Sequence, residues 1–362
     1  MNSLSTLNSN IFISKVKLPE DVESKNHYLN NHRYYENHRN SMLENGIEIS
    51  EQITPALDSC LNKVCDSLSF DRNKVVAFVY ASPNINADCT SIDGESCLIR
   101  ITSSLVSILD DWELMFVLGH ELGHYLLGHI ACHDGYNEKQ DLEILQIQRS
   151  RELSADRVGY LACGSLEESI QAMMKIASGL TTPQIRFDIA KFISQIKSMV
   201  NIDFSTSLMK THPSLLIRAR SILWFSLRIK NLEELQSAND DDIKWANNRV
   251  ILDLEKYIDG GLRQRINELK EEIIMLKICS ILIADIDAFE ENKLKIKAQK
   301  GHQYYSRIED FLSLYQRKNI TNTIEMKFNE SISELYKNYP KSASNIEEDA
   351  IRKAYLVFEY RP

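Results

Sequence analysis

The sequence contains no apolar run long enough to cross a membrane. Its most apolar stretch, residues 273–289, is interrupted by Lys277, Asp285 and Asp287, whereas a membrane-spanning helix needs about 20 predominantly apolar residues. We therefore expect this stretch to be a buried helix of a soluble bundle. The N-terminus lacks the basic residues and apolar core of a secretory signal peptide, so we expect a cytoplasmic location.

Positive charge is also scarce. The chain has 42 Lys and Arg against 51 Asp and Glu, a formal net charge of −9, and no dense basic cluster. Nucleic-acid-binding proteins usually carry a basic stripe, so we expect no nucleic-acid partner. The cysteines number seven, and no two of them have the CxxC spacing of a zinc knuckle or redox motif. An odd number of cysteines without a signal peptide favours reduced thiols.

The length and composition indicate a large globular chain. With 362 residues, of which 43% are hydrophobic, it can bury a sizeable core and form more than one domain. We predict a mostly α (α+β) fold with an N-terminal helical extension at 1–70, a central domain at 71–232 and an α-helical accessory domain at 236–362. Apolar spacing predicts helix through residues 21–68, and "ANDDD" at 238–242 is interpreted as a linker.

The central domain begins with two predicted strands. Residues 74–80 (KVVAFVY) and 96–102 (SCLIRIT) are rich in β-formers and bounded by turn residues. Asp110 is a predicted N-cap, with Glu113 as its capping-box partner. The helix that they start is expected to cover residues 111–130.

This helix carries an unusual set of polar residues. Within "VLGHELGHYLLGH" at 117–129, His120 and His124 are four residues apart and lie on one helix face. They can aim two imidazoles at one point, and Glu121 can hold a water bound there, which is the HExxH arrangement of zinc metallopeptidases. Buried polar groups are costly unless satisfied, and a metal would satisfy them. The alternative is two core histidines that hydrogen-bond to backbone or water.

A catalytic zinc site needs a third protein ligand. A histidine six residues after His124 is one possible source, but Ile130 occupies that position and His129 lies one residue early, on another side of the helix. The next predicted helix, which carries "SRELSAD", is the other source. There Glu152 and Asp156 share a face, so Glu152 can ligate the metal and Asp156 can accept the remaining N–H of a ligand histidine. The alternative is an ordinary solvated helix face.

Three motifs in this order resemble the gluzincin peptidases that include the heat-shock protease HtpX and the CAAX prenyl proteases. They are "LGHELGHYLLGH" at 118–129, "ELSADRVGYLA" at 152–162 and "THPSLLIR" at 211–218, and the resemblance covers about residues 75–225. It implies a zincin-like metallopeptidase domain with a small β-sheet, and a zinc-dependent endopeptidase acting on protein substrates. Those relatives are membrane-embedded, whereas no membrane-spanning segment is predicted here. We therefore do not expect this chain to act on membrane substrates.

The resemblance also implies residue roles. His120, His124 and Glu152 would bind one Zn²⁺ ion, and Glu121 would be the general base and acid that assists attack by a zinc-bound water. Asp156 would support a ligand histidine from behind.

Two further roles come from the third motif. His212 would approach the site and stabilise the oxyanion, and Arg218 would support that segment. The alternatives are a loop residue before Pro213 and a surface helix residue, respectively.

Other functions stay open at this point. One is a narrow-specificity regulatory protease of the antirestriction or repressor-cleaving type, although such proteases lack the "THPS" motif. The other is a non-catalytic, metal-bound interaction protein, although a structural site would not need Glu121. The C-terminal helical region offers a surface for a protein partner. Residues 96–102 are a candidate edge strand that an extended substrate could join, with Cys89 or Cys97 near enough to cap the metal.

Overall fold

The computed structural model describes most of the chain. It covers residues 9–19, 21, 31–92, 96–129, 142–201, 213–284, 289–298, 302–313, 320–340 and 342–359. The chain divides into a first compact unit, residues 1–136 and 146–257, and a second, residues 137–145 and 258–362. Because compact units need not be independently folding domains, the three-part division expected from the sequence stays a prediction.

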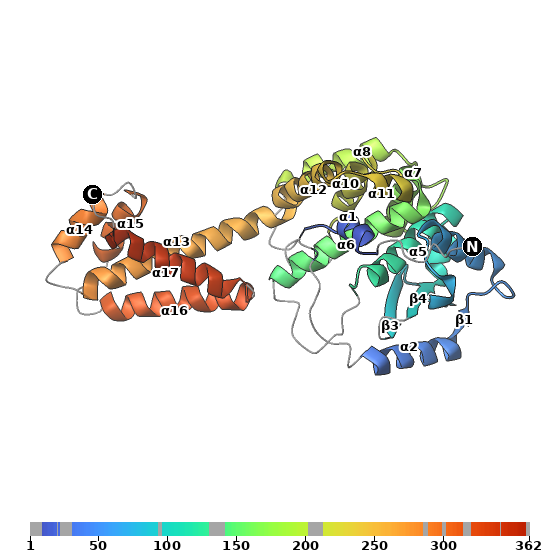
Figure 1. Cartoon of the computed structure of the whole chain (residues 1–362), viewed down its shortest axis with the longest axis horizontal. Helices are drawn as coiled ribbons and strands as arrows, with labels where there is room; N and C mark the ends of the chain where they lie inside the picture. The colour runs from blue at the N-terminus through green and yellow to red at the C-terminus, as the bar shows by residue number, and fades with distance from the viewer. Residues whose placement is uncertain are drawn as a thin grey trace. The chain divides into compact units, whose positions relative to one another are not determined.

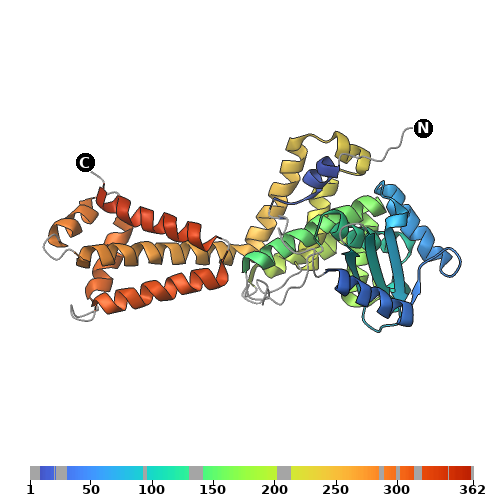
Figure 2. The ribbon, with the colours of Figure 1, turned by 60° about the horizontal axis from the view of Figure 1, so that its bottom comes forward.

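A four-stranded mixed sheet forms one layer of the first unit (Figures 1 and 2). Its order is β1 (Gly46–Glu48), β2 (Val75–Tyr80), β4 (Ser96–Thr102) and β3 (Ala87–Ile92). β2 is parallel to β4, whereas β1 and β3 are antiparallel to their neighbours. The expectation that residues 96–102 form an edge strand was wrong, because β4 pairs on both sides. Its core, from Cys97 to Ile99, is 0% exposed, as is typical of strands covered on both faces.

A strand replaces part of the helix that was expected near the N-terminus. α2 (Asn31–Asn45) ends at β1, and α3 (Pro55–Ser67) begins only after a turn. The expectation of helix throughout residues 21–68 was therefore wrong over residues 46–54, where β1 is followed by a turn. Here, pairing with a neighbouring strand outweighs the helical spacing of the apolar side chains. Residues 22–30 lie outside the described part of the chain.

Helices make up the rest of the first unit. They are α1 (Ser9–Val16), η1 (Arg72–Lys74), α4 (Ser103–Ile108), α5 (Asp111–Leu126), α6 (Leu142–Cys163), α7 (Leu166–Ser178), α8 (Ile189–Ser194), η3 (Gln195–Asn201), α10 (Leu215–Ser226), α11 (Leu232–Ser237), α12 (Asp240–Leu254) and η4 (Glu255–Asp259). Residues 142–145 of α6 and 258–259 of η4 are assigned to the second unit. α5 packs on β3 and β4 and against α3 and α7. At its start, Asp110 accepts hydrogen bonds from the amides of Trp112 and Glu113, and Glu113 accepts one from the Asp110 amide. This confirms the predicted capping box.

The acidic run at 238–242 begins a helix rather than forming a linker. α12 starts at Asp240, and the Asn239 side chain accepts a hydrogen bond from the Asp242 amide at 2.9 Å. Acidic side chains in a first turn lie at the positive end of the helix dipole, where they are stabilising. The linker prediction was wrong because the polar residues that cap a helix are the same types that form loops.

The second unit is a helical bundle built around α13 (Gly260–Ala284), which packs against α15 (His302–Ser313), α16 (Ile320–Asn338) and α17 (Ala343–Glu359). α14 (Phe289–Ala298) contacts α13, α15 and α17. The buried face of α13 includes Ile273, Leu276 and Leu282, each 0% exposed, which confirms a buried bundle helix in the apolar stretch. Within the described ranges, no helix is both long enough and apolar enough to span a membrane.

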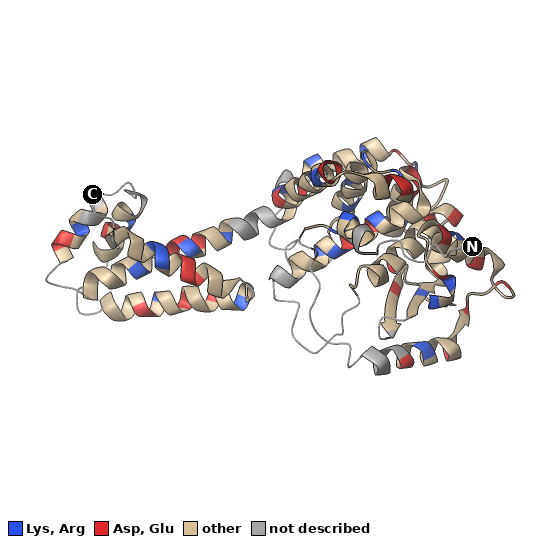
Figure 3. Ribbon diagram, in the orientation of Figure 1, with Lys and Arg blue, Asp and Glu red and all other residues tan. Residues whose placement is uncertain are grey.

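Charged residues of both signs are mixed along the helices of this bundle (Figure 3). Arg265 of α13 pairs with Glu334 of α16 at 2.8 Å, and Lys270 of α13 pairs with Asp349 of α17. Exposed ion pairs contribute about 0–1 kcal/mol each. The apolar face of α13 therefore holds the bundle together, and the ion pairs add little.

Candidate metal centre

The site lies where α5 and α6 approach closely. A Cβ atom added at Gly119 of α5 would lie 2.4 Å from the Ala162 Cβ atom of α6, and one added at Gly123 would lie 2.9 Å from the Val158 Cβ atom. Only a hydrogen atom fits at these two positions, which are one helical turn apart. The GxxxG spacing within α5 was a signal of this close packing that the sequence analysis missed.

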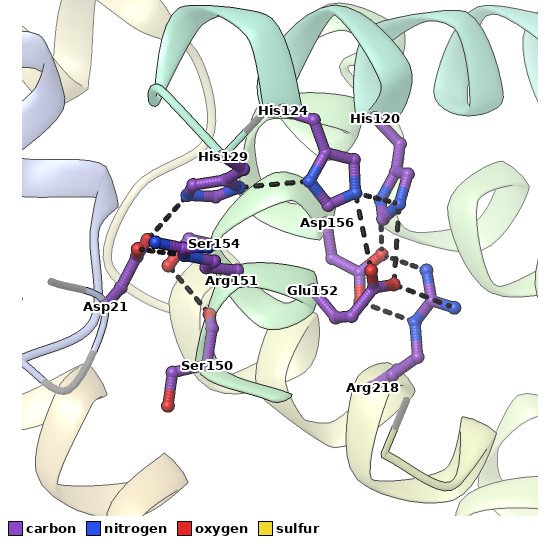
Figure 4. Close-up of polar contacts among 10 residues, drawn as sticks. All are labelled: Asp21, His120, His124, His129, Ser150, Arg151, Glu152, Ser154, Asp156 and Arg218. Carbon is purple, nitrogen blue, oxygen red and sulfur yellow. Dashed lines mark hydrogen bonds and ion pairs between the residues drawn. The ribbon is translucent and has the colours of Figure 1, made fainter. Parts of the chain in front are cut away.

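The close approach brings three of the predicted residues together (Figure 4). The Nε2 atoms of His120 and His124 lie 3.1 Å apart. The Glu152 carboxylate of α6 reaches both histidines, at 3.7 Å from His120 Nε2 and 3.4 Å from His124 Nε2. One ligand atom from each of these residues lies within 4.8 Å of the others. His120 is 7% exposed and Glu152 is 9% exposed, so the cluster is shielded from bulk water.

The contacts of the Nδ1 atoms of His120 and His124 indicate which ring nitrogens carry protons. His120 Nδ1 lies 3.0 Å from Asp156 Oδ1, and His124 Nδ1 lies 3.0 Å from His129 Nδ1. His129 in turn faces the Asp21 carboxylate through Nε2, at 2.9 Å. A carboxylate accepts hydrogen bonds but cannot donate them. A neutral ring whose Nδ1–H donates leaves a lone pair on Nε2.

The donor set therefore fits a metal cation. With both Nδ1 atoms protonated, two Nε2 lone pairs and the Glu152 carboxylate converge with no proton to share. Burial holds the pKa of His124 well below its usual value, so this ring is neutral at neutral pH. Two histidines and one glutamate are the donor set of several catalytic zinc sites.

Asp156 and Arg218 form a buried pair behind the cluster. Arg218 of α10 donates from Nε and Nη2 to the two carboxylate oxygens of Asp156, at 2.9 and 2.6 Å, and its Nη1 lies 3.8 Å from Glu152. Burial alone would raise the pKa of Asp156, but the Arg218 charge and hydrogen bonds hold it below its usual value. Burial alone would lower the pKa of His120, but Asp156 outweighs this and raises it.

Glu121 lies beside the cluster and is 7% exposed. Burial raises its pKa to about 7, although His120 opposes the shift, and the Cys89 thiol hydrogen-bonds to this carboxylate. Cys89 lies on β3 and also hydrogen-bonds to Cys97. A carboxyl group with a pKa near neutrality can both take up and release a proton under ordinary conditions.

Two residues that the sequence did not single out for this role, His129 and Asp21, contact this network. His129 was considered only as a metal ligand; it lies behind His124, outside the three-residue cluster. Asp21 comes from the N-terminal segment, and no sequence signal pointed to it. Burial lowers the pKa of His129, although Asp21 opposes this. The remaining predicted residue, His212, lies outside the described residues, while Ser214 of the same motif caps α10 by accepting from the Ile217 amide.

Comparison with known proteins identifies the domain. Two segments of the chain, residues 51–138 and 135–224, match the family model of peptidase family M48. Over these residues the chain is similar to peptidase family M48. The match confirms the resemblance drawn from the sequence motifs and contains α5, α6 and Arg218. The match supports a metallopeptidase domain of the zincin-like, mostly helical class, located mainly in the first unit. Searches of curated proteins and of solved structures returned no match.

Proposed function

We propose that this chain is a zinc-dependent endopeptidase in which His120, His124 and Glu152 hold one Zn²⁺ ion. The observation that carries the proposal is the convergence of two imidazole lone pairs and a carboxylate on one point (Figure 4). Three protein ligands leave a fourth position for water, as in catalytic zinc sites. When bound, zinc would lower the pKa of that water towards about 7 and polarise the scissile carbonyl.

Glu121 is the proposed general base and acid. It follows directly after His120 on α5, so its carboxyl group lies beside the metal-binding face. Burial favours the protonated form of this carboxyl group and, without metal, raises its pKa to about 7. The group can therefore take a proton from the attacking water and return it to the leaving amine. The Cys89 hydrogen bond fixes the direction of this carboxylate towards β3.

The remaining predicted residues act through others. Asp156 holds the His120 ring by facing its Nδ1–H, and Arg218 in turn holds Asp156 through two hydrogen bonds. His212 follows the family pattern as a stabiliser of the oxyanion. Arg218 thus supports the metal-binding side of the site directly, rather than only the segment that carries His212.

The proposed substrate is an extended polypeptide that joins the edge of the sheet. In the described part of the chain, β3 pairs with β4 alone and its outer edge has no strand partner. β3 packs against α5, and its Cys89 contacts Glu121. A peptide that adds to this edge by backbone hydrogen bonds would therefore pass beside the general base. The second unit is a proposed surface for a protein partner, and a cytoplasmic location stays a prediction.

The test compares the purified full chain with three variants, Glu121→Gln, Glu152→Gln and Glu167→Gln. Zinc content is measured first, and cleavage of casein and of a peptide blocked at both ends is measured second. Glu121→Gln should bind zinc without cleaving, and Glu152→Gln should lose both properties. Glu167 is exposed on α7, so Glu167→Gln is the matched control and should behave like the wild type.

Two results would contradict the proposal. One is a wild-type chain that binds no zinc, and the other is a Glu121→Gln variant that cleaves as fast as the wild type. Cleavage of the blocked peptide separates an endopeptidase from an enzyme that needs a free terminus.

A further inference from the structure

The N-terminal segment, residues 9–19 and 21, lies outside the family match but packs against the metal-site helix α6. The Leu18 amide donates to Ser154 Oγ at 3.1 Å, and Arg157 donates from Nη1 to the Val16 carbonyl at 3.1 Å. Val16 and Leu18 are 0% and 1% exposed. The segment is therefore part of the core around α6. Its contact residue Ser154 is two positions after Glu152 on that helix.

The segment brings one buried carboxylate to the back of the site (Figure 4). The side chain of Asp21 is 0% exposed, and its Oδ2 atom accepts a hydrogen bond from His129 Nε2 at 2.9 Å. Arg151 of α6 lies 3.9 Å from Asp21 Oδ1. A buried carboxylate is costly unless it is paired or hydrogen-bonded. The buried Asp21 carboxylate is thus stabilised by its hydrogen bond from His129.

When both rings are neutral, the hydrogen bonds that link Asp21, His129 and His124 can have only one direction. Because Asp21 accepts, His129 Nε2 carries the proton and His129 Nδ1 is an acceptor. His129 Nδ1 lies 3.0 Å from His124 Nδ1, so His124 Nδ1 must be the donor. His124 Nε2 is then left with a lone pair that points at His120 and Glu152. This is the form of the ring that binds a metal.

We propose that Asp21 and His129 are positioning residues, which together set the tautomer and the orientation of His124 for metal binding. The inference rests on the proposed zinc site and extends it to Asp21, which lies outside the residues matched to the family. His120 has a carboxylate directly behind it, in Asp156. His124 has instead a histidine and then a carboxylate, and the carboxylate comes from the N-terminal segment. Hydrogen bonds of this kind fix ligand histidines and strengthen metal binding.

The test measures zinc affinity in the full chain, by competition with a chromogenic chelator at fixed pH, and so does not depend on activity. The variants are His129→Leu, Asp21→Ala, their double variant, and Asp21→Asn, whose amide oxygen can still accept from His129. Loss of such partners weakens metal binding about 10- to 100-fold, so His129→Leu and Asp21→Ala should each fall in or near this range. The double variant should be no weaker than His129→Leu alone, because Asp21 acts through His129. Asp21→Asn should weaken zinc binding clearly less than Asp21→Ala does, because the amide oxygen still accepts from His129.

A matched control separates positioning from general damage to the N-terminal segment. Lys15 anchors the same segment by donating from Nζ to the carbonyls of Leu235, Gln236 and Ala238. Lys15→Met should lower the free energy of unfolding without changing zinc affinity. Urea unfolding establishes that each variant is folded, and Asp21→Ser, too short to reach His129, replaces Asp21→Ala should that variant not fold.

The outcomes separate this inference from the proposed function. Equal zinc affinity in the wild type, His129→Leu and Asp21→Ala overturns the positioning role while the zinc site stands. Additive losses in the double variant, or a loss for Asp21→Asn as large as for Asp21→Ala, overturn it as well. A wild-type chain that binds no zinc overturns both ideas. A chain that binds zinc without cleaving peptides overturns only the peptidase assignment.

Discussion

Glu121 is expected to destabilise the metal-free protein at neutral pH, and Glu121→Gln should relieve this. The carboxyl group is 7% exposed, and burial raises its pKa from 4.5 to about 7. In the unfolded chain it ionises at its ordinary pKa. Between these two values the unfolded state has released a proton that the folded state still holds, so stability falls as the pH rises. This loss of stability is absent below the pKa of Glu121 in the unfolded chain and is complete above about pH 7.

The magnitude follows from the size of the shift. One pKa unit corresponds to about 1.4 kcal/mol, so ionising Glu121 in the folded protein costs about 3 kcal/mol in full. Part of this cost is already present at pH 5. Between pH 5 and pH 8, the wild type should therefore lose roughly 2–3 kcal/mol of unfolding free energy relative to Glu121→Gln. Any constant difference between the buried amide and the protonated acid cancels in this comparison.

The assay is urea unfolding of the chelator-treated full chain at several pH values. Tryptophan fluorescence reports on the first unit alone, because Trp112, Trp224 and Trp245 all lie there. Glu167→Gln is the control and should track the wild type at every pH, since Glu167 is exposed. A difference in unfolding free energy between wild type and Glu121→Gln that does not change with pH would refute the reasoning. Glu121 would then have to be well solvated or fully paired.

Three further predictions follow from the packing and charges of the site. Gly119→Ala should destabilise the first unit by roughly 1–3 kcal/mol and weaken zinc binding, because the new Cβ would lie 2.4 Å from that of Ala162; Gly119→Ala combined with Ala162→Gly should recover part of both in the same urea and chelator titrations. Arg218→Met should cost roughly 3–5 kcal/mol at neutral pH, since it leaves buried Asp156 without its partner, and the loss measured by urea unfolding should shrink in acid as Asp156 becomes protonated. Removal of zinc with a strong chelator should abolish cleavage, and re-addition of zinc should restore it; cleavage that persists after complete removal would contradict a metal-dependent mechanism.

The local parts of this site could be predicted from the sequence because helical geometry is local. His120 and His124 share a face wherever residues 111–126 form a helix, and the capping box at Asp110 marks where that helix starts. The same reasoning paired Glu152 with Asp156. That the two pairs meet was inferred from the need for a third metal ligand, and the family resemblance implied the same. The physical reason, the fit of Gly119 against Ala162, depends on a contact between helices.

Apart from the linker prediction at 238–242, which failed on local helix capping, the errors concern interactions between segments that are distant in sequence. The strand at Gly46–Glu48 exists because β2 offers hydrogen-bond partners, and the position of β4 inside the sheet depends on β3 folding back beside it. The Asp21–His129 hydrogen bond joins residues 108 positions apart. Periodicity carries no information about such contacts, since the residues involved have ordinary neighbours along the chain.

The charges around the site support a divalent cation independently of the motif. Three buried carboxylates, from Glu121, Glu152 and Asp156, lie around a single guanidinium, that of Arg218. Burial keeps His124 neutral, so when all three carboxylates are ionised they exceed the positive charge of Arg218 by two if His120 is neutral, and by one if its raised pKa leaves it protonated. Buried charges persist only when they are paired or coordinate a metal. A bound Zn²⁺ ion would neutralise this excess and lower the pKa of Glu121 from about 7, and the penalty that separates wild type from Glu121→Gln should therefore shrink when zinc is added.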